Sequence, residues 1–218
     1  MPLFDASEHE KSEYEANHKV KCGDRAQAIL SFWFGPPNDP SYGRYHKAWF
    51  IKDDGFDEQI RQRFLTDTQK AAAGEYDSWL ATPTSAVALL LLLDQFPRNL
   101  YRGSDRSFAT DAQALKVAQQ LVDTGADKAL PPFYRFFVYV PFEHSEAMTD
   151  QNRCVELMQN LIQTAPDIDD GFKNGVDYAI RHRDIIERFG RFPHRNEILG
   201  RPSTPEEIAF LQQPGSGF

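Results

Sequence analysis

The sequence is poor in cysteine, and that shortage excludes two classes of protein. Only two cysteines occur among the 218 residues. Cys22 and Cys154 stand far apart and without metal-ligand spacing, so the sequence predicts neither a disulfide framework nor a metal site. We expect both thiols to be packing residues in a cytoplasmic protein.

Basic charge and long apolar runs are also scarce. The chain has 24 lysines and arginines against 32 acidic residues, a formal net charge of −8, and no long basic run. Such a surface repels a phosphate backbone, so nucleic acid is not an expected partner. The longest apolar run, Ala86 to Leu93, has eight residues. A membrane-spanning helix needs about 20, so we expect a buried core helix and no membrane association.

Motifs of several enzyme classes are missing as well. The sequence contains no Gly-rich phosphate loop and no motif around a serine or cysteine nucleophile, so nucleotide hydrolysis and acyl transfer are not supported. No cofactor is predicted. Residues 1–23 are strongly charged and lack the order of a secretory signal, which predicts a polar, dispensable N-terminal arm. The length then suits a single all-α domain over residues 24–218.

What the sequence does contain is helix punctuation along most of its length. Asp24 is expected to cap a first helix, and residues 56–73 form an amphipathic pattern that ends before Gly74. Thr82, with Pro83 at the first helical position, is expected to cap the buried apolar run. Residues 109–122 repeat their apolar positions at helical spacing.

The second half of the chain continues the pattern. Pro131 and Pro132 are expected to open a helix that Pro141 breaks or kinks. Thr149 or Asp150 is expected to cap the next helix. Residues 172–189 are expected to form a long helix that ends at Gly190, and Ser203 and Glu206 have the spacing of a capping box. Together these signals predict an all-α fold of roughly eight helices in antiparallel pairs.

Four longer motifs carry a resemblance to a known family. They are LLLLLDQFPRNLYRG (89–103), FATDAQAL (108–115), FVYVPFEHSE (137–146) and HRDIIERFGRFPHRNEILGR (182–201). Over about residues 25–214 the chain resembles the mainly bacterial family catalogued as domain of unknown function 924. The resemblance implies an all-α, tetratricopeptide-like helical superhelix, and it implies no reaction.

The first charged group follows the leucine run directly. A carboxylate such as Asp94 at the end of a buried helix needs a cation or several donors, and Arg98 and Arg102 are the nearby candidates. One interpretation is that Asp94 and Arg98, with Asn99, tie down a turn between helices. The other is that Arg98 and Arg102 clamp an anionic ligand, since guanidinium groups present paired donors.

Glu143, His144 and Glu146 form the second group. Histidine titrates near neutral pH and a carboxylate can orient it, so Glu143 and His144 are candidate catalytic residues for acid–base chemistry. The alternative is a salt-bridged corner. No second histidine stands at metal-motif spacing, so no metal is predicted.

The third group is an arginine cluster in an acidic protein. Residues 181–201 hold six arginines and three acidic residues, a local charge of +3. Arg183 with Glu187 and Asp184 with Arg188 are spaced for pairing along a helix. The remaining surplus indicates either an anion pocket or pairing with distant carboxylates such as Glu143 and Glu146. The predicted ligand-binding residues are Arg98, Arg102, Glu143, His144, Glu146, His182, Arg191, His194 and Arg195.

Two functions follow from these patterns. The first is a helical protein with a charged pocket that binds, and in one version transforms, a small anionic molecule. The alternative is a scaffold that presents a groove to a peptide or protein partner. Polar residues packed into core-like motifs favour the pocket, whereas a scaffold would place them along an exposed groove.

Overall fold

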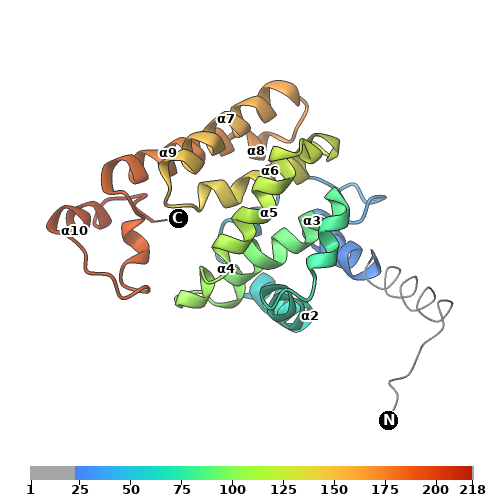
Figure 1. The fold of residues 1–218 in the computed structure, drawn as a ribbon, viewed down its shortest axis with the longest axis horizontal. Coiled ribbons are helices and arrows are strands. Elements are labelled where there is room, and N and C mark those ends of the chain that lie inside the picture. Colours follow the sequence, from blue (N-terminus) through green and yellow to red (C-terminus); the bar gives the residue numbers. More distant parts are fainter. Residues whose placement is uncertain (1–22, 218) are drawn as a thin grey trace, which may run out of the picture.

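The computed structural model describes residues 23–217, which are helical and contain no strand within that range (Figure 1). The all-α prediction is therefore confirmed for this part of the chain. Residues 1–22, with Cys22 and nearly all of the predicted arm, lie outside the described residues. The separable arm and the domain boundary at residue 24 stay predictions.

Most of the helices follow one another with short connections, and longer stretches, 35–53 and 190–204, precede the helices that begin at Asp54 and Pro205. Residues 23–34 are helical, and a π-helical stretch, Leu91–Gln95, joins two α-helices without a break. The α-helices are α2 (Asp54–Ala72), α3 (Pro83–Leu90), α4 (Phe96–Leu100), α5 (Asp111–Asp123), α6 (Pro132–Glu143), α7 (Met148–Thr164), α8 (Asp170–Lys173), α9 (Gly175–Phe189) and α10 (Pro205–Leu211).

Capping residues explain where several of these helices begin and end. The Asp53 carboxylate accepts hydrogen bonds from the backbone N–H groups of Gly55 and Phe56 at the start of α2. Thr82 accepts from the Ser85 N–H at 3.2 Å and Pro83 occupies the first position of α3, as predicted. Gly190 ends α9 in the left-handed conformation, with φ of 69°, also as predicted.

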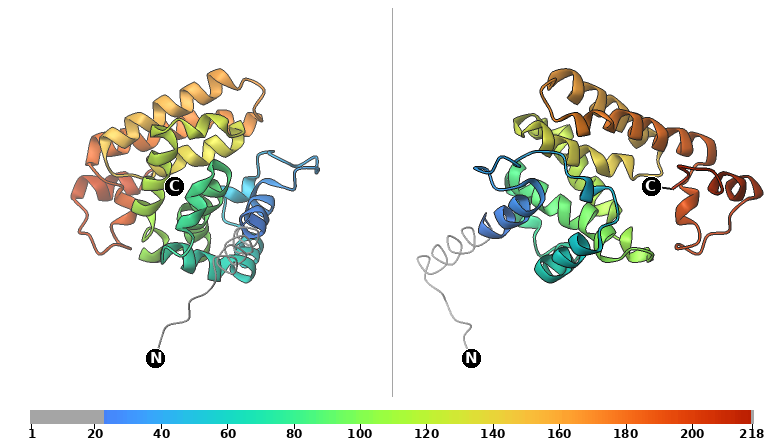
Figure 2. Two further views of the ribbon diagram at one scale, coloured as in Figure 1. Left: turned by 45° about the vertical axis from the view of Figure 1, so that its right-hand side comes forward. Right: turned by 180° about the vertical axis from the view of Figure 1, so that it is seen from behind.

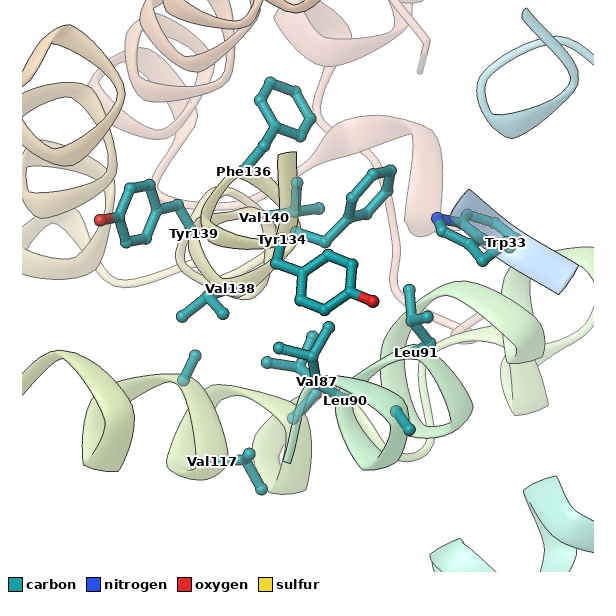
Figure 3. Close-up of a cluster of buried hydrophobic side chains, with 14 of the residues drawn as sticks. Trp33, Val87, Leu90, Leu91, Val117, Tyr134, Phe136, Val138, Tyr139 and Val140 are labelled. Carbon is teal, nitrogen blue, oxygen red and sulfur yellow. The ribbon is translucent and has the colours of Figure 1, made fainter. Parts of the chain in front are cut away.

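The leucine run forms the centre of the core. Every side chain from Ala86 to Leu93 is buried, because α3 packs against both α5 and α6. In Figure 3, Val87 and Leu90 of α3 point toward Tyr134 of α6. The predicted buried core helix is confirmed.

Helices α5, α6, α7 and α9 are neighbours in sequence order and run in alternating directions (Figures 1 and 2). This layered arrangement of antiparallel pairs matches the prediction made from the short connections. It fits a tetratricopeptide-like architecture.

The end of α9 and the residues after it form a second, much smaller cluster. Ile185, Ile186 and Phe192 are buried together, with Phe189 and Phe210 packed against them. We call residues 190–217 the C-terminal segment; in Figures 1 and 2 it lies at one end of the molecule, beyond the end of α9. Phe192 is fully buried, with none of its surface exposed.

The predicted break of α6 at Pro141 and the predicted side-chain cap of α7 are both wrong. Pro141 does not break α6, which continues to Glu143 with His144 as its C-cap. A proline removes one helical hydrogen bond, but the buried side chains around it keep the backbone helical for this last turn. Thr149 and Asp150 lie inside the first turn of α7, which begins at Met148 without a side-chain cap.

Three further boundaries differ from the prediction. Asp24 does not cap its helix, because Gly23 is already helical. The predicted long helix is interrupted at Asn174, between α8 and α9. The capping box is formed one position later, by Thr204 and Glu207, because Pro205 takes the first helical position of α10.

Within residues 23–217, no helix combines the length and the apolar character needed to cross a bilayer.

Candidate functional site

Asp94 lies in the π-helical stretch and is fully buried. Single π-turns inside α-helices are frequent at functional sites. Its carboxylate contacts His144 Nδ1 at 2.7 Å, accepts a hydrogen bond from Gln95 Nε2 at 2.6 Å, and lies 3.4 Å from Arg98 Nη1. Burial alone raises the pKa of Asp94, but His144, Arg98 and these hydrogen bonds outweigh burial and bring the pKa to about 2. Asp94 is therefore ionised at neutral pH.

His144 is the imidazole that Asp94 orients. It follows the last residue of α6, where its ring reaches the π-helical stretch of the neighbouring layer. Burial first, and the charge of Arg98 second, lower the pKa of His144 in spite of Asp94. The neutral ring donates its Nδ1–H to Asp94, which leaves Nε2 on the opposite edge as a hydrogen-bond acceptor.

Arg98 and Asp111 complete this ion-paired layer. Arg98 donates to both oxygens of Asp111, at 2.9 and 3.1 Å, and to the backbone carbonyl of Asp94 at 2.7 Å. Asp111 is the first residue of α5, where a helix N-terminus favours a carboxylate. Arg98 thus has carboxylate or carbonyl partners on several of its donors and holds α4 against α5.

Arg195 approaches the same layer from the C-terminal segment. Its side chain is sandwiched between the rings of Phe108 and Phe192, with the guanidinium carbon 4.6 and 4.5 Å from their centroids. Nη1 donates to Asp111 at 3.3 Å, and Nε has no hydrogen-bond partner among the described residues. Burial and then the charge of Arg98 lower the pKa of Arg195 to about 10, so it remains a cation at neutral pH.

Glu143 and His182 form a second buried pair next to the first. His182 Nδ1 lies 3.3 Å from Glu143 Oε1 and 2.8 Å from the carbonyl of Tyr178. Burial first, and then the negative charge of Asp94, raise the pKa of Glu143 to about 8, so this carboxyl is protonated at neutral pH. Burial lowers the pKa of His182 to about 3 and that of the adjacent His194 to about 4.

Glu146 ties the C-terminal segment to the start of α7. Both of its oxygens accept hydrogen bonds from Arg201, at 2.7 and 3.0 Å, and one also accepts the backbone N–H of Phe192 at 2.8 Å. These interactions offset the effect of burial and lower the pKa of Glu146. Because Arg201 is paired with Glu146, its guanidinium is not available to a ligand. The pair instead fixes the loop that carries Arg195.

A cavity of about 530 Å³ opens where these elements meet. This volume lies in the usual range of small-molecule sites. Its apolar wall is formed by Phe108, Ala109, Ala112, Leu115, Pro141 and Leu199. Its polar groups are Asp105, Asp111, His144, Ser145, Glu146 and Arg195.

The structure separates the predicted site residues into two sets. Arg102 lies apart from the cavity, where it donates to Asp57. Arg191 is likewise apart, paired with Glu207 at 2.7 and 2.8 Å. The fold brings the other predicted residues together, either on the cavity wall or buried behind it. They are Arg98, Glu143, His144, Glu146, His182, His194 and Arg195.

Pairing accounts for most of the arginine cluster, though not by the pairs predicted along α9. Arg183 contacts its neighbour Asp184 at 2.8 Å, and Arg188 contacts Glu206 of α10 at 2.8 Å. The predicted spacing overlooked α10, which brings a competing carboxylate to the end of α9. Arg195 differs from these exposed pairs because it is buried and only weakly hydrogen-bonded.

Two important residues were not among the predicted set. Asp111 bridges Arg98 and Arg195, and Phe108 stacks on Arg195. Both belong to the motif FATDAQAL, which carries part of the family resemblance. The position of Asp111 at the start of a predicted helix could have marked it as a candidate. Its contact with Arg195, 84 positions away, could not be predicted from the sequence.

Among the described residues, no group of three or more histidine, cysteine, aspartate or glutamate side chains has an arrangement suited to a metal ion. Cys154 is a free, buried thiol that contacts the carbonyl of Tyr139 at 3.6 Å. It lies in the core cluster and outside the cavity wall.

The comparisons with known proteins agree with the fold. The chain matches a family model described as "Bacterial protein of unknown function (DUF924)" over residues 29–215. A solved structure of a protein of unknown function from Agrobacterium tumefaciens is similar, with 40% sequence identity and a TM-score of 0.73. The match covers 87% of this chain and 98% of that one. A comparison with curated proteins finds no match. The chain therefore belongs to the bacterial family DUF924.

Proposed function

We propose that the cavity binds a small organic anion and that Arg195 is its principal contact. The observation that carries this proposal is a buried guanidinium, 6% exposed, on the cavity wall with one side-chain hydrogen bond among the described residues. A guanidinium has five N–H donors and usually satisfies most of them when buried. A carboxylate or phosphate oxygen in the cavity would supply the acceptors that Arg195 lacks.

Arg98 has a different role in this proposal. Its donors are engaged by Asp94 and by both oxygens of Asp111, so it has little capacity left for a ligand. It neutralises the buried Asp94 and the partly buried Asp111 instead. This arrangement lets Asp94 stay ionised and hold His144 in one tautomer.

The Asp94–His144 pair supports acid–base chemistry on the bound molecule. His144 lines the cavity with a neutral ring whose Nδ1–H is committed to Asp94, so Nε2 can accept a proton from a ligand or from water. The Asp94 carboxylate stabilises the imidazolium that would form. Glu143, the other candidate catalytic residue, does not line the cavity and contacts His182 instead, so it would act only through its neighbours.

The placement of the polar groups supports a pocket over the scaffold alternative. Asp94, Glu143, His182 and Arg195 are all buried at the junction of α4, α5, α6 and the C-terminal segment. A groove that binds a peptide would expose its polar side chains to solvent along the helices. Arg195 instead lines the cavity, and the other three are buried close to it.

The test compares Arg195→Gln with Arg102→Gln, an arginine that pairs with Asp57 away from the cavity. Thermal melts of the parent should shift upward with small carboxylates or phosphate, because a ligand that binds only the folded state stabilises it. The Arg195→Gln protein should fold, since Asp111 keeps Arg98, and should lose the shift. Arg102→Gln should retain it. An unchanged shift in Arg195→Gln, or no shift in the parent with any anion, would overturn the proposal.

A further inference from the structure

The wall of the cavity carries more acidic than basic side chains. Asp105, Asp111 and Glu146 face it, against one arginine, Arg195. A ligand with two negative charges would bring the second charge close to these carboxylates. The charge balance therefore disfavours a phosphate dianion and favours a ligand with a single negative group.

Two of the three carboxylates are already paired with arginine and accept three hydrogen bonds each. Asp111 accepts from Arg98 at 2.9 and 3.1 Å and from Arg195 at 3.3 Å. Glu146 accepts from Arg201 and from the Phe192 N–H. Each therefore has about one acceptor position left for a ligand cation, and its charge is already neutralised by arginine.

Asp105 is different. It is an exposed residue of the cavity wall, three positions before Phe108. Its carboxylate accepts a hydrogen bond from Ser104 Oγ at 3.1 Å. An ionised carboxylate can accept about four hydrogen bonds, so most of its capacity remains. His144 Nε2 is a second acceptor on the same wall, because Asp94 takes the Nδ1–H.

We propose that the ligand is a zwitterion with an apolar side chain, that is, an apolar amino acid or a molecule with the same end groups. Its carboxylate binds Arg195, its ammonium donates to His144 Nε2 and Asp105, and its side chain packs on Leu115, Pro141 and Leu199. This inference rests on the proposed anion site at Arg195 and adds to it a cation subsite. It also names Asp105 as the residue that sets the specificity.

The test uses calorimetric titration of the intact chain with three compounds that share the branched side chain of leucine. L-leucine carries both charges, 4-methylpentanoate lacks the ammonium and 3-methylbutylamine lacks the carboxylate. We expect L-leucine to bind at least about tenfold more tightly than either relative, a difference of about 1.4 kcal/mol. Apolar amino acids from alanine to phenylalanine are compared in the same way with their deaminated acids, so that the result does not depend on one side-chain size.

Two variants assign the subsite. Asp105→Asn should weaken L-leucine about three- to tenfold and leave 4-methylpentanoate unchanged or slightly tighter, because one carboxylate is removed from the wall. The matched control is Asp177→Asn, an exposed carboxylate on α9 outside the cavity wall, which should change neither affinity. Arg195→Gln should abolish binding of both acids.

The outcomes separate this inference from the proposed function. If the deaminated acids bind as tightly as the amino acids, or if only inorganic phosphate binds, the zwitterion is excluded while the anion site stands. If Asp105→Asn leaves the preference for L-leucine unchanged, Asp105 is not the cation subsite and the inference fails. If no amino acid, carboxylate or phosphate binds, both the inference and the proposed function fail.

Discussion

The helices from α3 to α7 bury a large and almost wholly apolar core, whereas the C-terminal segment is attached by few apolar side chains and several ion pairs. In the main core, nearly every side chain from Ala86 to Leu93 is less than 2% exposed. The smaller cluster has Ile185, Ile186 and Phe192 as its buried apolar members. The ion pairs that join the C-terminal segment to the rest of the chain are Arg188–Glu206, Arg195–Asp111 and Arg201–Glu146, while Arg191–Glu207 braces the segment internally.

This difference matters because the cavity lies between the two regions. Phe108, Leu115 and Pro141 belong to the main body, while Arg195 and Leu199 come from the C-terminal segment. Regions with few buried apolar contacts open locally at a lower free-energy cost than the rest of a protein. Access to the proposed site should therefore depend on the attachment of the C-terminal segment, while the geometry of Asp94 and His144 depends on the main core.

The largest effect is expected from breaking the ion-paired layer of the main body with Arg98→Gln. Asp94 is fully buried and Asp111 mostly so, and both would lose their principal cation. Stranding a buried charge costs about 3–5 kcal/mol, so the free energy of unfolding should fall by that amount. Urea denaturation followed by circular dichroism measures it.

Arg102→Gln is the matched control for this prediction. Arg102 lies one helical turn after Arg98 but pairs with Asp57 nearer the surface. Its loss should cost about 1 kcal/mol or less. Equal effects of the two substitutions would show that Asp94 does not depend on Arg98.

The helical framework was largely predictable from the sequence because its determinants are local. Thr82 with Pro83 and Gly190 act within one turn of the backbone that they cap or end, and the leucine run requires burial on every side. The errors have an equally local origin. Ser203 and Thr204 are both competent caps, and only the position of Pro205 decides between them.

The site was only partly predictable because its contacts join distant parts of the chain. Asp94 meets His144 across 50 positions and Asp111 meets Arg195 across 84, and no periodicity links either pair. The sequence identified residue types unusual for their surroundings, such as a carboxylate after five leucines. It could not distinguish Arg98, which is close to Asp94, from Arg102, which points to Asp57.

An intermediate effect is expected from Glu207→Gln, which loosens the C-terminal segment. Glu207 is 2% exposed and accepts hydrogen bonds from Arg191, Asn196 and the Thr204 N–H. At neutral pH the variant should lose amide-exchange protection in residues 190–211 while α3, α5 and α6 remain protected. Hydrogen exchange followed by mass spectrometry resolves the two regions.

The pH dependence of this effect has a definite sign. Arg191 is the main reason that the pKa of Glu207 lies at about 2, below its usual value of 4.5. A lowered carboxyl pKa contributes stability that is fully present above pH 4.5 and is lost as the pH falls toward about 2. The difference between the parent and Glu207→Gln should therefore shrink over this range. His194, whose pKa of about 4 lies in the same range, contributes to the stability of both proteins, so its contribution cancels in this difference. A difference that stays constant down to pH 2 would contradict this assignment.

The smallest effect is expected from Arg188→Gln, in the pair that is most exposed among those attaching the C-terminal segment. Arg188 and Glu206 are 47% and 65% exposed, whereas the carboxylate of Glu207 is only 3% exposed. Exposed pairs contribute about 1 kcal/mol or less and are screened by salt, so Arg188→Gln should change the unfolding free energy very little. Exchange protection in residues 190–211 should stay close to that of the parent, and adding salt should remove the remaining difference. A loss of protection as large as that of Glu207→Gln would mean that the number of ion pairs, rather than their burial, attaches this wall of the cavity.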